Sequence, residues 1–174
     1  MTKFTFNSLN RDNSKEIAKS IKQLYHSQMP VIVCVGSDLS VGDSFGPMIG
    51  TALIKRLHGY AYVYGTLDSP ITAKEIVTIS EHILKLHPNS KIIVIDAALG
   101  EEENVGFVKV CSEGIKPGQG VNKDLPKIGN VSIIGVVADK NSAYKVKNVG
   151  VRLSLVHKLS CDVIEGLVMA FLGV

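Results

Sequence analysis

The sequence has few cysteines and no pattern that would join them. Cys34, Cys111 and Cys161 are odd in number and lie far apart in the chain. A disulfide framework needs an even set of cysteines, and a zinc knuckle needs pairs at CxxC spacing; neither is present. We therefore expect three free, buried thiols in a reducing cytoplasm.

Long hydrophobic runs and clusters of one charge are also missing. No uncharged apolar run approaches the roughly 18 residues of a membrane-spanning helix, and the first residues, MTKFTFNSLNRDNSKE, lack the apolar segment of a secretory signal. Lysine and arginine number 19 against 16 acidic residues, so the net charge is only +3, and the cations are spread along the chain. These features predict a cytoplasmic protein with no membrane or nucleic-acid partner.

Enough apolar residues are present for a hydrophobic core. The chain has 174 residues, of which 45% are hydrophobic. This content excludes a disordered chain, and the length falls within the roughly 100–200 residues of one domain. We expect residues 1–174 to form a single domain.

Uninterrupted apolar strands alternate with amphipathic helices along the chain. The pattern predicts strands at 30–36, 61–65, 91–97, 104–111 and 131–137, and helices at 13–28, 47–58, 72–86 and 151–172. Capping-box spacing starts two of the helices, with Asn13 before Glu16 and Thr72 before Glu75. Strands without polar alternation are typical of a sheet covered on both faces. The sequence therefore predicts an α/β fold, a three-layer αβα sandwich with a mixed, mostly parallel five-stranded sheet.

Aspartates follow most of the predicted strands. Asp38 and Asp43 come after the first, Asp68 after the second, Asp96 at the end of the third and Asp139 after the fifth. Ligands of such sheets bind outside the carboxyl ends of the strands, so this edge is the candidate site. All five histidines lie in predicted helices or at their ends, away from it.

Asp96 directly follows the buried run IIVI. Partial burial raises the pKa of a carboxyl group, and a second carboxylate nearby raises it further. Two such acids can share one proton and act as acid and base. One alternative is that both acids are ionised and, together with Asp68, bind a hard divalent cation. The other is that the Asp96 side chain only stabilises a turn.

Asp43 lies in the glycine-rich loop GSDLSVGDSFG, which has no phosphate-binding motif. Glycines allow this loop to turn sharply and approach its neighbours. The alternative is that Asp43 or Ser44 caps the following helix. Turn formation is the simpler interpretation of Asp38, Asp68 and Asp139.

The long irregular segment 112–130 is the other candidate. Loops of this length are usually functional or mobile. Gly118 and Gly120 would allow close backbone approach, and Lys123 could be a charge partner for the acids. A flexible crossover is the alternative interpretation.

Three motifs resemble a known family. The runs VGSDLSVGDSFGPMIGTAL, IIVIDAALG and KPGQGVNKDLPKIGNVSIIGVV closely resemble the YyaC-type sporulation proteins of spore-forming Firmicutes. They are more distantly similar to the germination protease, which degrades small acid-soluble spore proteins, and to the hydrogenase maturation proteases.

The resemblance implies a hydrolase fold, a peptidase activity and a site. Asp43 and Asp96 take the places of the proposed aspartic catalytic pair of the germination protease, and we assign substrate binding to Asp68, Gly118, Gly120 and Lys123. The implied partner is a protein or peptide substrate, such as a small acid-soluble spore protein, in the spore or forespore, and a homo-oligomer is compatible with it.

The resemblance also implies a site without a metal or other cofactor. No histidine occurs in 112–130, so the third nickel ligand of the maturation proteases has no counterpart here. A non-catalytic regulatory or binding protein of sporulating cells on a peptidase-like fold is the alternative function.

Overall fold

The computed structural model describes residues 2–9, 11–26, 29–72, 74–116, 127–141 and 150–173. Its strands are β1 (Lys3–Asn7), β2 (Val31–Cys34), β3 (Tyr62–Tyr64), β4 (Ile92–Gly100), β5 (Phe107–Cys111) and β6 (Val131–Asp139). Its α-helices are α1 (Ser14–Leu24), α2 (Phe45–Arg56), α3 (Ile76–Leu86) and α5 (Leu153–Leu172), and two 3-10 turns are η1 (Gly42–Ser44) and η2 (Glu102–Asn104).

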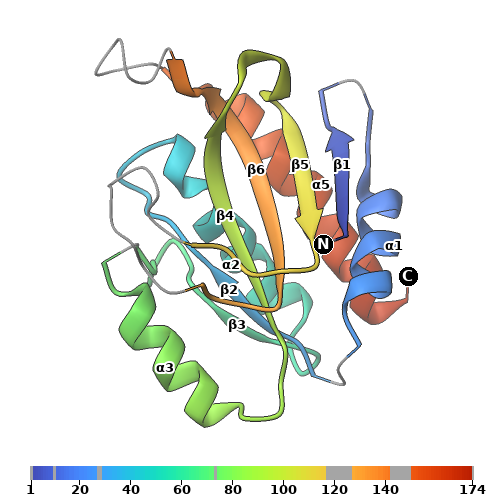
Figure 1. Cartoon of the computed structure of the whole chain (residues 1–174), viewed down its shortest axis with the longest axis vertical. Coiled ribbons are helices and arrows are strands. Elements are labelled where there is room, and N and C mark those ends of the chain that lie inside the picture. Colours follow the sequence, from blue (N-terminus) through green and yellow to red (C-terminus); the bar gives the residue numbers. More distant parts are fainter. Residues whose placement is uncertain are drawn as a thin grey trace.

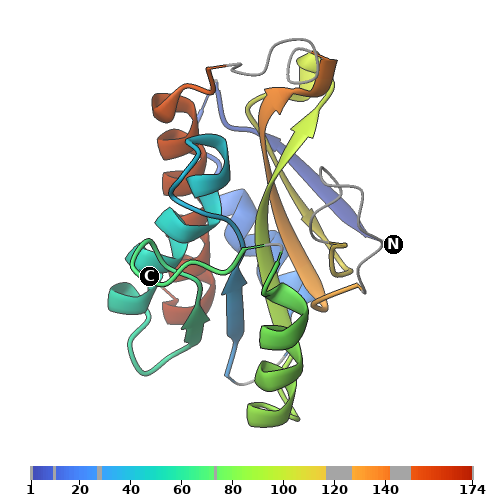
Figure 2. The same cartoon turned by 90° about the vertical axis from the view of Figure 1, so that its left-hand side faces the viewer.

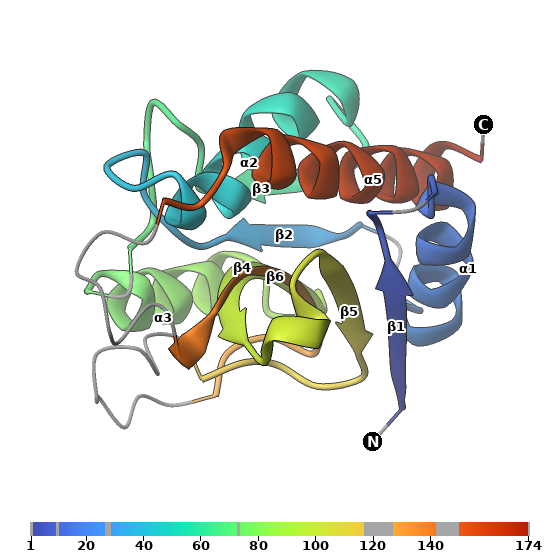
Figure 3. The same ribbon diagram turned by 90° about the horizontal axis from the view of Figure 1, so that it is seen from above.

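The strands form one mixed sheet in the order β1-β5-β6-β4-β2-β3 (Figure 1). The pairs β6–β4, β4–β2 and β2–β3 are parallel, whereas β1–β5 and β5–β6 are antiparallel. Helices α1, α2 and α5 lie on one face and α3 lies on the other (Figure 3). The predicted α/β class and mixed sheet are confirmed.

The predicted strand number is wrong, because β1 makes a sixth strand. Phe4 and Phe6 alternate with polar residues and pack against the main core, while Lys3 and Thr5 are exposed. A short strand with two inward side chains has a weak period-2 signal. Its pairing with β5, about a hundred residues away in the chain, is what stabilises it.

Strand β4 is longer than predicted, which changes the position of Asp96. The strand continues to Gly100, with an irregularity between Ala98 and Leu99, so Asp96 lies within it and pairs with Ile134 of β6. On its other side β4 loses its partner, since β2 ends at Cys34 opposite Ile95. Asp96 is therefore paired on one side only.

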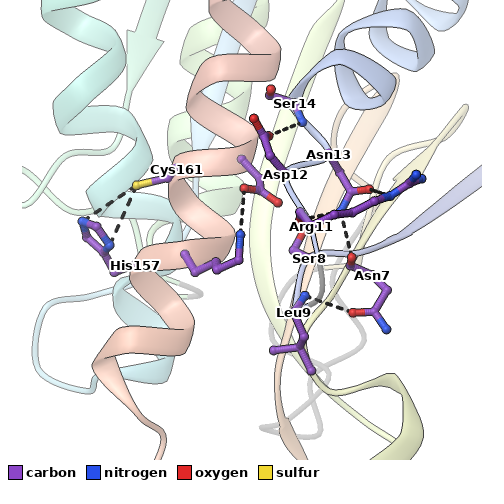
Figure 4. A network of polar contacts seen from close by, with 11 residues as sticks. Asn7, Ser8, Leu9, Arg11, Asp12, Asn13, Ser14, His157 and Cys161 are labelled. Atoms are coloured by element: carbon purple, nitrogen blue, oxygen red, sulfur yellow. Dashed lines mark hydrogen bonds and ion pairs between the residues drawn. The ribbon is translucent and has the colours of Figure 1, made fainter.

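The predicted cap of α1 is wrong in detail. Asn13 occupies the N-cap position without a side-chain cap hydrogen bond. Instead, Asp12 Oδ1 accepts a hydrogen bond from the Ser14 backbone N–H at 2.8 Å (Figure 4). In the second predicted capping box, the Thr72 N–H does donate a hydrogen bond to Glu75 Oε2 at 3.2 Å. Helix α3 itself begins at Ile76, one residue after Glu75.

Helix α1 packs closely on α5, and α5 carries an ion pair between a buried aspartate and a partly exposed lysine. The Asp162 side chain is only 5% exposed; its Oδ1 lies 3.6 Å from Lys158 Nζ, and its Oδ2 has no hydrogen-bond partner among the described residues. Within the described residues, Lys158 is thus the cation that compensates a carboxylate removed from water.

We expect Lys158→Met to lower the free energy of unfolding by about 1–3 kcal/mol, because it leaves a buried charge uncompensated. Urea denaturation at neutral pH measures this. Lys19→Met, an exposed position on α1, is the matched control and should change stability little. Equal losses in the two variants would contradict the ion-pair argument.

Candidate active site

The sheet reverses its winding between β2 and β4. From β2 the chain passes through α2 to β3, and from β3 it crosses back through α3 to β4, on the other side of β2. The two crossover helices lie on opposite faces of the sheet (Figure 2). The carboxyl ends of two strands that diverge in this way are where open α/β sheets bind ligands.

Asp43 is carried to this position by the loop after β2. The loop folds back so that the Ser37 N–H donates a hydrogen bond to the Asp43 backbone oxygen at 3.1 Å. Gly36 permits this contact: its φ is +139°, and a Cβ there would lie 2.0 Å from the Asp43 oxygen. The sequence showed these glycines but did not show which contact needs them.

Capping does not account for Asp43. The N-cap of α2 is Ser44, and it makes no side-chain cap hydrogen bond. The Ser44 hydroxyl donates instead to the Val41 carbonyl oxygen at 2.7 Å. The capping alternative for this pair of residues is therefore wrong.

Asp96 projects from β4 toward the face that carries α3. Ile93 and Ile95 belong to the core under α1, α2 and α5, whereas Val94 belongs to the core under α3. Because side chains alternate along a strand, Asp96 lies on the same face as Val94. It is half-buried, and its Oδ1 accepts a hydrogen bond from the Ala97 N–H at 2.8 Å.

The two carboxyl groups influence each other. Burial and then repulsion from Asp43 raise the pKa of Asp96 to about 7, against a small opposing effect of the Ala97 N–H. Burial also raises the pKa of Asp43, opposed by a hydrogen bond from the Ser37 backbone, even though residue Asp43 as a whole is solvent-exposed. At neutral pH this arrangement keeps Asp96 partly protonated.

The other predicted binding residues are not all placed. Asp68 is exposed in the loop after β3, where the Thr66 N–H donates to the Ser69 oxygen at 3.0 Å. Gly118, Gly120 and Lys123 lie outside the described residues. Within the part of the chain that the structure describes, no three His, Cys, Asp or Glu side chains form a group that could hold a metal ion, so Asp68 does not complete one with the acid pair.

The prediction of free, buried thiols is confirmed for Cys34 and Cys111 but wrong for Cys161, which is exposed. All three cysteines are free; Cys34 is fully buried in β2, and burial raises the pKa of its thiol. No helix in the described ranges is both long and apolar enough to span a membrane.

The fold is that of the hydrogenase maturation proteases. The structure is similar to the [NiFe] hydrogenase maturation protease HycI from Thermococcus kodakarensis KOD1, with a TM-score of 0.53 over 87% of this chain and 97% of that protein. The sequences are 12% identical in this comparison, so the similarity concerns the fold.

The chain belongs to the family described as "Protein of unknown function (DUF1256)", whose pattern matches residues 5–166. It is 38% identical to the uncharacterized protein YyaC of Bacillus subtilis (strain 168) over 137 residues. That alignment covers 79% of this chain and 67% of the relative. The resemblance to YyaC-type proteins is thereby confirmed.

Proposed function

We propose that this protein is a peptidase-like hydrolase in which Asp43 and Asp96 act as a general acid–base pair. The observation that carries the proposal is the Asp96 carboxyl, whose pKa is raised to about 7 by burial and by Asp43. Carboxyl groups with pKa values near the working pH are typical of catalytic acids and bases. In further support, Asp43 follows β2 and Asp96 lies in the last part of β4, near the edge where open α/β sheets bind ligands.

The environments of the two acids suggest their roles. Asp96 is the more strongly perturbed acid and holds the shared proton, while the more exposed Asp43 is ionised. Asp43 removes a proton from a water molecule as it attacks the carbonyl carbon of the peptide bond. Asp96 gives its proton to the departing amine, so the pair ends with the same number of protons as it began.

We further propose a protein or peptide substrate in sporulating cells, such as a small acid-soluble spore protein. The support is the likeness of the Asp43 loop and the Asp96 strand to those of the germination protease. The alternative function is that of a regulatory protein, which would bind peptides at the same acid pair without cleaving them.

The pH dependence of cleavage tests the proposed roles. Because Asp96 must be protonated, activity should be greatest on the acidic side of pH 7 and fall as the pH rises through about 7. It should fall again at low pH, where Asp43 becomes protonated. The measurement is the initial rate of cleavage of a small acid-soluble spore protein between about pH 4 and pH 8.

Absence of cleavage at every pH would contradict the peptidase proposal. A rate that keeps rising above pH 7 would contradict the role of Asp96 as the acid. Asp38→Asn is the control, since Asp38 is an exposed residue of the same loop; its profile should match that of the wild-type protein.

A further inference from the structure

A row of side chains runs across the sheet from Asp96 to a lysine. Asp96 of β4 is opposite Ile134 of β6, and Ile134 is opposite Lys109 of β5. Residues that are opposite each other on neighbouring strands project from the same face. Strands lie about 4.8 Å apart, so Lys109 is about 10 Å from Asp96 along this row.

This row is only partly covered by the rest of the described structure. Ile134 and Lys109 are only partly buried, whereas Ile133 and Val108, which face α1, α2 and α5, are fully buried. Helix α3 packs elsewhere on the same face, against β2 and the first part of β4. Within the described residues, the row from Asp96 to Lys109 is thus a partly exposed strip beginning at the candidate active site.

The far end of the strip is cationic. Lys3 of β1 is opposite Cys111 of β5, and Cys111 lies two residues from Lys109, on the same face of the strand. The side chains of Lys3 and Lys109 are therefore diagonal neighbours across the two strands. Neither lysine makes an ion pair with another described residue. Burial and then Lys3 lower the pKa of Lys109, and an anion bound there would relieve both effects.

We propose that Lys109, assisted by Lys3, determines specificity by binding a carboxylate of the peptide substrate. This inference rests on the proposed function and names the substrate class, an acidic peptide. An extended peptide advances about 3.3 Å per residue, so the acidic side chain lies about three residues from the bond at Asp43 and Asp96. An apolar side chain between them would contact Ile134.

Cleavage of an equimolar degenerate decapeptide library, read by mass spectrometry, tests the inference. We expect Asp and Glu to be enriched about tenfold at one position, two to four residues from the cut, as for a hydrogen bond between charged groups. Lys109→Met and Lys109→Gln should remove this enrichment, and Lys109→Glu should favour Lys and Arg there. Lys19→Met, on the opposite face, is the matched control and should keep the wild-type preference.

A binding assay separates failure of this inference from failure of the proposed function. The same library is captured on Asp96→Asn protein, with and without Lys109→Met, and the retained peptides are sequenced. If wild-type protein cleaves nothing but acidic peptides are retained only when Lys109 is present, the peptidase proposal fails and the ligand class stands. The inference is overturned if peptides are cleaved or captured without enrichment of acidic residues. It is also overturned if the enrichment is unchanged in folded Lys109→Met and Lys109→Gln proteins.

Discussion

Replacing Asp43 or Asp96 by asparagine should abolish cleavage of a small acid-soluble spore protein. An amide can neither accept the proton of the attacking water nor give one to the departing amine, and a positioned acid or base contributes about 10²–10⁴-fold to such reactions. Because the two acids act as one unit, the double variant should be little worse than either single variant. Product formation is measured by mass spectrometry at about pH 6.

Asp38→Asn separates this expectation from a general effect of charge. It removes one negative charge from the same loop and should keep most of the activity. Circular dichroism establishes that the variants are folded. Activity retained by folded Asp43→Asn and Asp96→Asn proteins would exclude the acid–base pair.

Asp96→Asn should stabilise the protein above neutral pH. Ionisation of Asp96 is opposed in the folded state, where its pKa is about 7 rather than 3.8. The stability that its protonated form contributes is fully present below about pH 4 and is lost as the pH rises to about 7. At about 1.4 kcal/mol per pKa unit, the loss is up to about 4 kcal/mol.

Asparagine is neutral at every pH, and its side-chain oxygen can still accept the Ala97 N–H. We therefore expect the melting temperature of Asp96→Asn to exceed that of the wild-type protein by several degrees at about pH 8, and the difference to shrink toward about pH 4. Thermal unfolding followed by circular dichroism at both pH values measures it. The same difference at both pH values, or one shared by Asp38→Asn, would show that ionisation of Asp96 costs the fold little.

The strands and helices were largely predictable because their signals are local. Runs such as IIVI lack polar alternation, and the final helix repeats apolar residues at helical spacing, so each segment shows its own structure. The strand β1 was missed because only Phe4 and Phe6 mark it, and its partner β5 is distant in the sequence. The extension of β4 past Asp96 was missed because it depends on pairing with β6.

The candidate acids could be named from the sequence, since aspartates that follow buried strands gather at one edge of a parallel sheet. The spatial relation between Asp43 and Asp96 could not be predicted from the sequence. The contact of Gly36 with the Asp43 oxygen depends on how the loop after β2 folds back, and the repulsion between Asp43 and Asp96 joins segments about fifty residues apart. Lys109 carried one local signal, a cation in the middle of an apolar strand, but nothing in the strand itself showed that it faces the Asp96 side.

The sequence by itself determined the α/β alternation, the apolar strands and the presence of acids after them. These depend on local backbone preference and on which side chains leave water. Only the tertiary structure decided that Asp43 and Asp96 perturb each other and that Lys109 shares a row with Asp96. The physical reason is that electrostatic coupling and strand register depend on distances through space, which are set only when the sheet is assembled.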